Sequence, residues 1–137
     1  MTTSPVSSED LLTADEFWQL PEPPQGGRME LVAGKVVTEM PVGERHAALA
    51  AEIAAYLLAF VKPNRLGRVY VELGHRLFSD PDTVRAPDVS FLPTGDAVRS
   101  DRYVEEAPLL AVEIMSPDDR EGDVAAKVEE YFDAGSQ

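Results

Sequence analysis

The stretch LLAVEIM, residues 109–115, is almost continuously apolar and carries one carboxylate, Glu113. An apolar run of this length is typical of a central strand that is covered on both faces. A carboxylate inside such a strand costs free energy unless it pairs with a cation or binds a metal. The stretch therefore predicts a fold built on a sheet and marks Glu113 as a candidate functional residue.

A second acid, Asp88, lies 25 residues before Glu113 in another predicted strand region, residues 84–92. Two carboxylates on neighbouring strands can share a divalent cation, which lowers the pKa of a bound water and stabilises charge developing on a phosphate. Two alternatives stay open for Asp88. It can be a charge on an edge strand, or it can form a local ion pair with a residue such as Arg85.

The rest of the chain predicts helices and strands around these two acids, so the expected fold class is α/β (α+β). Residues 13–20 begin with a capping box, in which Thr13 and Glu16 satisfy free amides of a short helix. Residues 29–32 and 35–38 predict a β-hairpin that turns at Ala33 and Gly34. We also expect helices over residues 44–61 and 123–134, strands over residues 67–73 and 75–78, and a polar connection over residues 93–108.

The two longer helices each show an apolar face at helical spacing. In the first, that face holds His46, Leu49, Ala50, Ile53, Leu57 and Phe60. In the second, it holds Val124, Val128, Tyr131 and Phe132. We expect these faces to pack on the sheet.

The composition predicts one domain and restricts the chemistry. The 137 residues suit a single core, expected over residues 12–137 after a disordered tail at residues 1–11. The lack of cysteine excludes disulfides, thiolate zinc sites and cysteine nucleophiles, so oxygen and imidazole ligands remain, and these favour Mg²⁺ or Mn²⁺. No apolar run is long enough to span a membrane and no secretory signal is visible, so we expect no membrane association and a cytoplasmic location.

The net charge of −13 opposes tight binding to a phosphate backbone, which relies on lysine and arginine. The charge is uneven along the chain. Residues 61–99 carry 6 basic and 5 acidic side chains, whereas residues 100–137 carry 3 and 11. Part of the acidic excess can serve to attract a divalent cation.

Three further residues are candidates with two interpretations each. Lys127 borders the apolar stripe of the last helix, where it can reach the sheet or extend to water. His46 can ligate a metal or orient a phosphate, or it can be a partly buried structural histidine. Glu30, in the hairpin, can line a site or face solvent. His75 and the acidic run at residues 118–123 are expected to be structural or solvated.

Several short motifs, taken in order, resemble the Uma-two family, bacterial proteins with a PD-(D/E)XK restriction-endonuclease-like fold. The opening LTADEF at residues 12–17 is similar to that of the family. The other motifs are ELVAGKV at residues 30–36, His46, APDV at 86–89, VEIMSP at 112–117, and Lys127 with Tyr131, Ala134 and Gly135.

The resemblance implies a mixed central sheet flanked by helices, and a nuclease that uses Mg²⁺ or Mn²⁺ on nucleic acid, with DNA expected. Asp88 would be the acid of the PD half-motif and Glu113 that of the (D/E)XK half, with the Ile114 carbonyl as a further metal ligand. Where the standard motif has its lysine, this chain has Met115. The resemblance implies that Lys127 supplies that charge.

Two further positions and the end of the chain also bear on the resemblance to the family. Glu30 and His46 match recurrent family positions and would line the same cleft. Family members usually continue past the Ala-Gly pair with a strand of the form PEYWIVD, whereas this chain ends at Gln137. We therefore expect the sheet to lack an edge strand, which would favour pairing with a second copy as a homodimer.

Three hypotheses about function follow. The first is a metal-dependent phosphodiesterase that acts on nucleic acid. The second is a catalytically inactive binding or regulatory module, favoured by the acidic composition and the displaced lysine. The third is a small-molecule enzyme or a metal-sensing domain on the same scaffold, because a fold does not fix a function.

Overall fold

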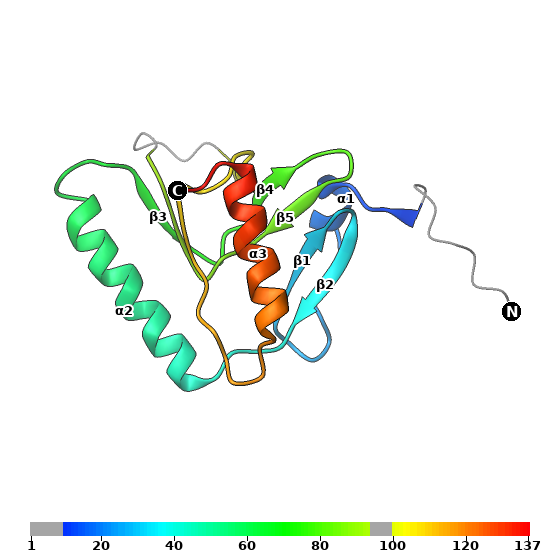
Figure 1. Ribbon diagram of the computed structural model, residues 1–137, viewed down its shortest axis with the longest axis horizontal. Coiled ribbons are helices and arrows are strands. Elements are labelled where there is room, and N and C mark those ends of the chain that lie inside the picture. The colour runs from blue at the N-terminus through cyan, green and yellow to red at the C-terminus, as the bar shows by residue number, and fades with distance from the viewer. Residues whose placement is uncertain (1–9, 94–99) are drawn as a thin grey trace, which may run out of the picture.

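The computed structural model describes residues 10–93 and 100–137, so most of the predicted disordered tail lies outside the described residues. Figure 1 shows the arrangement of the elements. They are α1 (Ala14–Trp18), β1 (Arg28–Val32), β2 (Lys35–Glu39), α2 (Glu44–Val61), β3 (Arg68–Val71), β4 (His75–Phe78), β5 (Thr83–Arg85), β6 (Val89–Leu92), β7 (Leu110–Val112) and α3 (Glu121–Ala134).

The strands form two antiparallel sheets, and the predicted α/β class with flanking helices is confirmed. One sheet has the order β2-β1-β5-β4 and the other the order β3-β6-β7. The predicted strand over residues 84–92 is divided between them, with Ala86, Pro87 and Asp88 at the crossing. Proline lacks an amide donor and therefore interrupts a hydrogen-bonded ladder.

The predicted hairpin is confirmed and its turn has the expected backbone. Ala33 and Gly34 both have positive φ, 48° and 80°, which is the pattern of a two-residue turn between twisted strands. The Gly34 amide donates to the Asp82 carbonyl at 2.8 Å, and the Gly34 carbonyl accepts from Leu12 at 2.9 Å. The turn thereby ties the hairpin to β5 and to the entry of α1.

Helices α1 and α3 cover opposite faces of the β2-β1-β5-β4 sheet. The capping box at Thr13 and Glu16 is present, and Phe17 of α1 packs with Leu31 and Val84 in the core. Neighbouring residues of a strand point to opposite faces. Glu30 and Arg85, next in sequence to these two core residues, therefore face α3.

Helix α2 packs against β3 and β6 of the second sheet, but on a narrower face than the sequence predicts. Ala54 and Val61 are buried, and His46, Ile53 and Leu57 are half-buried. The predicted face was wrong at two positions, because Leu49 is 42% exposed and Phe60 is 64% exposed. Within the described residues, α2 has neighbours on one side, so the outer residues of its apolar face remain exposed.

Two further predictions about burial were wrong. Strand β7, expected to be central, lies at the edge of its sheet in the described part of the chain, with Leu110 exposed and Glu113 just beyond the strand. In α3, Val128 and Phe132 are exposed, and the helix presents Lys127, Glu130 and Tyr131 inward. The inward face of α3 is polar because it lies over charged residues of the sheet. No described helix has the length and apolar character needed to cross a bilayer.

We predict that Leu31→Ala lowers the free energy of unfolding by about 2–5 kcal/mol, because Leu31 is fully buried and truncation leaves a cavity. The control is Val36→Ala. Val36 is the cross-strand partner of Leu31 but is exposed, so its truncation is expected to cost less than about 1 kcal/mol. Urea unfolding followed by circular dichroism measures both. Equal losses would show that the core does not centre on Leu31.

Candidate functional site

The two acids singled out in the sequence, Asp88 and Glu113, lie beside each other in the structure. Val89 pairs with Val112 across β6 and β7, so one further step of this antiparallel register aligns Asp88 with Glu113. The Ile114 amide donates to Asp88 Oδ2 at 2.6 Å, which fixes the segment after β7 against Asp88. Both acids are shielded from water, and Asp88 is almost completely buried.

The other oxygen of Asp88 faces two nitrogen-bearing side chains. Arg28 Nη2 donates to Asp88 Oδ1 at 2.9 Å, and His46 Nε2 lies 3.4 Å from the same oxygen. The predicted placement of His46 beside the acids is therefore observed. Its second ring nitrogen, Nδ1, is buried and makes no hydrogen bond within the described residues. The alternative in which Asp88 pairs with Arg85 is not observed, since the arginine that contacts Asp88 is Arg28.

Lys127 points inward from α3 and meets three carboxylates. Its side chain is 14% exposed, so the alternative in which it extends to water was wrong. The ammonium donates to Glu39, lies 3.3 Å from Glu30 Oε1 and lies 3.7 Å from Glu113 Oε2. The Tyr131 hydroxyl, one turn later on the same helix, donates to Glu113 Oε1 at 2.9 Å.

Glu30 is completely buried, so the alternative in which it faces solvent was also wrong. Its Oε2 accepts from the Ala86 amide at 2.7 Å, and its Oε1 accepts from Arg85 at 3.1 Å. Arg85 in turn donates to Glu130 of α3 at 2.5 Å. Glu30 therefore lines the site while tying β1 to the chain crossing and, through Arg85, to α3.

Arg28 and Glu39 also belong to the site, although neither was predicted as a member from the sequence. They are cross-strand partners at the open end of the hairpin, and their ion pair measures 3.4 Å. A signal for them was present, because a hairpin that turns at Ala33 and Gly34 pairs residue 28 with residue 39 when its register is extended. Arg28 also reaches Glu72 at 3.2 Å.

Burial and the neighbouring charged groups together shift the pKa values of Glu30, Glu39, Glu113 and Lys127. Burial raises the pKa of Glu113 to about 7, although Lys127 acts in the opposite direction. Burial alone would lower the pKa of Lys127, but Glu30, Glu113 and Glu39 raise it above its ordinary value. The pKa of Glu30 is raised by burial and by its hydrogen bond to Glu39. The pKa of Glu39 is lowered, against the effect of burial, by that bond and by Lys127.

The donor set of this cluster suits a hard divalent cation held by few protein ligands. Within residues 10–93 and 100–137, no three histidine, aspartate or glutamate side chains converge in a group that would hold a metal. Asp88 and Glu113 nevertheless present oxygens from adjacent strands. Mg²⁺ is commonly bound by one or two carboxylates and keeps several waters. The chemistry of these two side chains therefore fits a hard divalent cation.

The residues expected to be structural or solvated follow that expectation. His75 is fully buried, and its ring nitrogens contact the Ser90 hydroxyl at 2.8 Å and the Glu106 carbonyl at 3.1 Å. Without access to the surface, this pair of serine and histidine cannot meet a substrate. The acidic side chains at residues 118–123 are exposed.

The similarity of the chain to known proteins agrees with the geometry of the site. The sequence model of the Uma2 family, which is the Uma-two family that the motifs resemble, is described as "Putative restriction endonuclease" and matches residues 14–137. The crystal structure of a "putative nuclease belonging to DUF820" from Anabaena variabilis resembles the chain with a TM-score of 0.73 and 29% identity. The match covers 92% of this chain and 70% of that chain. No curated protein matches the sequence.

We predict that Glu113 makes the metal-free protein less stable as the pH rises. Its folded-state pKa, about 7, lies above the ordinary 4.5, so the folded protein binds the proton more tightly than the unfolded chain. The resulting stability is present below pH 4.5 and is lost as the pH rises through 7. From about pH 5 to pH 8, the wild type should lose about 2 kcal/mol relative to Glu113→Gln.

Urea unfolding of both proteins across this pH range, with a chelator present, measures the difference. Other titrating groups affect both proteins alike, so the comparison isolates Glu113. Parallel stability curves would show that Glu113 is already ionised in the folded state at pH 5.

Proposed function

The chain belongs to the Uma2 family of putative restriction endonucleases, and from this premise we propose that it hydrolyses phosphodiester bonds of nucleic acid, with DNA as substrate, in a reaction that requires a divalent metal. The observation that carries the proposal is the alignment of Asp88 and Glu113 across β6 and β7, with Lys127 beside them. Two buried acids and an inward lysine on adjacent elements form the minimum set for metal-assisted phosphoryl chemistry.

In this proposal Asp88 and Glu113 hold Mg²⁺ or Mn²⁺, with the Ile114 carbonyl as a further ligand. When bound, such a metal lowers the pKa of a coordinated water and stabilises charge on the phosphate. The pKa of Glu113, about 7, means that protons compete with the metal at neutral pH. Metal binding is therefore expected to strengthen as the pH rises.

The side chains around the two acids have distinct tasks. Lys127 remains charged, since its pKa is raised, and its ammonium stabilises the negative charge that develops during bond cleavage. His46 and Arg28 both contact Asp88 Oδ1, and in this proposal they orient the phosphate. Glu30 contacts no substrate in this scheme. It positions Lys127 at 3.3 Å and holds Arg85 and the Ala86 amide.

A second candidate function, a non-catalytic module that binds a partner, is favoured by one specific observation. Arg28 already forms an ion pair with Asp88, and Lys127 forms one with Glu113, the two carboxylates that a metal would use. A site neutralised by its own cations can persist as a structural network without any metal. The two candidates differ in metal affinity, which makes that the property to measure first.

We predict that calorimetric titration of Mn²⁺ into the wild type gives a binding isotherm that Asp88→Asn and Glu113→Gln each weaken by at least about tenfold, because each removes a negatively charged ligand. The control Glu129→Gln removes an exposed carboxylate from α3 and should leave the isotherm unchanged. A wild-type isotherm that survives both ligand substitutions would exclude this metal site. An absence of binding by the wild type would favour the non-catalytic module.

We further predict that Lys127→Met lowers the rate of DNA cleavage in Mn²⁺ by about 10²–10³, the usual effect of removing one group that stabilises transition-state charge. Mn²⁺ binding should persist in this variant. The control Lys62→Met removes an exposed lysine at the end of α2 and should retain the wild-type rate. Rates on single- and double-stranded DNA and RNA define the substrate. Full activity of Lys127→Met would remove Lys127 from the mechanism.

A further inference from the structure

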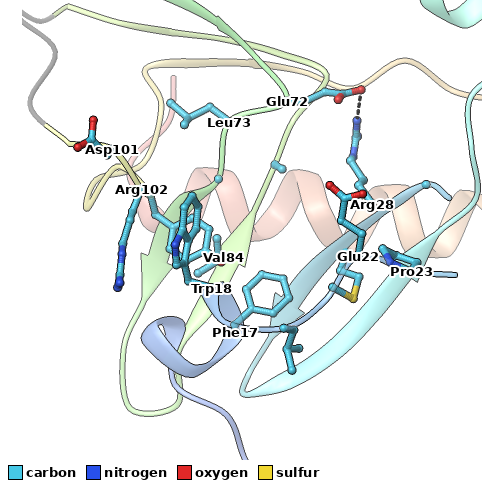
Figure 2. A pocket seen from close by; sticks show the side chains of 16 residues that line it. Phe17, Trp18, Glu22, Pro23, Arg28, Glu72, Leu73, Val84, Asp101 and Arg102 are labelled. Atoms are coloured by element: carbon cyan, nitrogen blue, oxygen red, sulfur yellow. Dashed lines mark hydrogen bonds and ion pairs between the residues drawn. The ribbon is translucent and has the colours of Figure 1, made fainter.

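A cavity of about 540 Å³ opens on the α1 side of the β2-β1-β5-β4 sheet. Its lining includes none of the acids of the carboxylate cluster, which consists of Glu30, Glu39, Asp88 and Glu113. Figure 2 shows Trp18 and Arg102 toward one end of it, with Glu22, Arg28 and Glu72 toward the other. Its volume falls within the range of pockets that bind small molecules, about 300–1,000 Å³. Of the residues that line it, only Arg28 acts on the phosphate in the scheme proposed above.

One wall of the cavity is aromatic. Trp18 is 44% exposed although it is the largest side chain of the region, and its ring meets Tyr103 edge-on at 5.2 Å. Tyr103 is also stacked with Phe17 at 6.0 Å, while the Arg102 guanidinium lies 5.7 Å from the centre of the Trp18 ring. An exposed indole that is held in place by neighbours offers a flat surface for stacking.

The wall depends on a glycine behind it. A Cβ at Gly74 would lie 2.4 Å from Tyr103 Cδ1 and 3.1 Å from Val84 Cγ1. The Tyr103 ring therefore packs directly against the backbone at Gly74. This close approach holds the Tyr103 ring, and with it the aromatic wall, against the sheet.

The cavity adjoins the carboxylate cluster through Arg28. This residue lines the cavity and also donates to Asp88 at 2.9 Å and to Glu72 at 3.2 Å. Glu72, which lines the cavity as well, donates its backbone amide to the Asp88 carbonyl at 3.3 Å. Arg28 and Glu72 therefore join one end of the cavity to the site at Asp88, whereas Trp18 lies toward the other end.

The charges of the lining select for the type of ligand. Glu22, Glu72 and Asp101 outnumber Arg28 and Arg102, so the cavity disfavours a phosphate. A nucleobase has the opposite requirements, because its flat face stacks on an aromatic ring and its N–H edges donate to carboxylates. In a duplex that face is already stacked, so only an unpaired base can enter.

We propose that this cavity binds an unpaired nucleobase of single-stranded nucleic acid, from the same strand whose phosphate is held at Asp88 and Glu113. The inference rests on the proposed nuclease function and deepens it, since it assigns the substrate strand an unpaired base outside the cleavage site. Trp18 stacks on the base, Arg102 holds the Trp18 ring, and the carboxylates accept from the edge of the base.

Trp18 is the only tryptophan of the chain, so its fluorescence reports on the cavity alone. Titration of the whole protein, with a chelator to prevent cleavage, uses four probes: a single-stranded DNA 12-mer, the same sequence as RNA, its DNA duplex, and an abasic DNA 12-mer with the same phosphates. Saturable quenching by a single strand, absent with the duplex and the abasic strand, is the expected result. Equal response to the abasic strand would overturn the proposal, because phosphates alone would then explain it.

Variants connect the signal to the aromatic wall. Trp18→Ala should weaken binding of a labelled single strand about tenfold by anisotropy, in line with the loss of one stacked base. Arg102→Ala, at an exposed position, should reduce binding and quenching severalfold without affecting the fold. The control Phe60→Leu removes an exposed aromatic ring from α2 and should change neither. Unchanged binding by both Trp18→Ala and Arg102→Ala would also overturn the proposal.

The two proposals fail in different ways. Cleavage in Mn²⁺ with equal affinity for intact and abasic strands would leave the nuclease function standing and remove the base site. Quenching by single strands without cleavage of any substrate would support the base site and remove the catalytic function. Comparison of the DNA and RNA strands then shows which sugar the site accepts.

Discussion

The buried carboxylate of Glu30 is the constraint on which this structure depends. A carboxylate with no solvent contact must be paired or protonated. Here it receives the Ala86 amide and the Arg85 guanidinium, and it lies beside the Lys127 ammonium. These contacts connect β1, the crossing between the sheets, and α3. The position of α3 over the sheet is thus set by polar contacts as much as by apolar packing.

This polar attachment explains which parts of the fold the sequence could predict. The capping box at Thr13 and the hairpin turn at Ala33 and Gly34 rest on local backbone chemistry, and both are observed. The rotation of α3 could not be predicted from its apolar stripe. Hydrophobic periodicity predicts that Val128 and Phe132 are buried. In the structure Lys127 and Glu130 face the sheet instead, because the face of the sheet beneath α3 is charged.

The candidate site shows the same division. Asp88 and Glu113 were recognisable as acids in apolar strands, and the antiparallel register brings them together. Arg28 and Glu39 were missed because their pairing follows only when the hairpin register is extended one residue beyond each predicted strand. The edge position of β7 was missed because an apolar run indicates burial but does not identify the neighbours that provide it.

The chain crosses from one sheet to the other at Ala86, Pro87 and Asp88, in the middle of the candidate site. Glu30 and Glu39 belong to the first sheet, whereas Asp88 and Glu113 flank strands of the second, and Lys127 contacts acids from both. A small change in the angle between the sheets would alter the separation of these carboxylates while each sheet keeps its internal hydrogen bonds. The distances between the charged groups of the site therefore depend on the angle between the sheets. A substrate that contacts both sheets would change these distances directly.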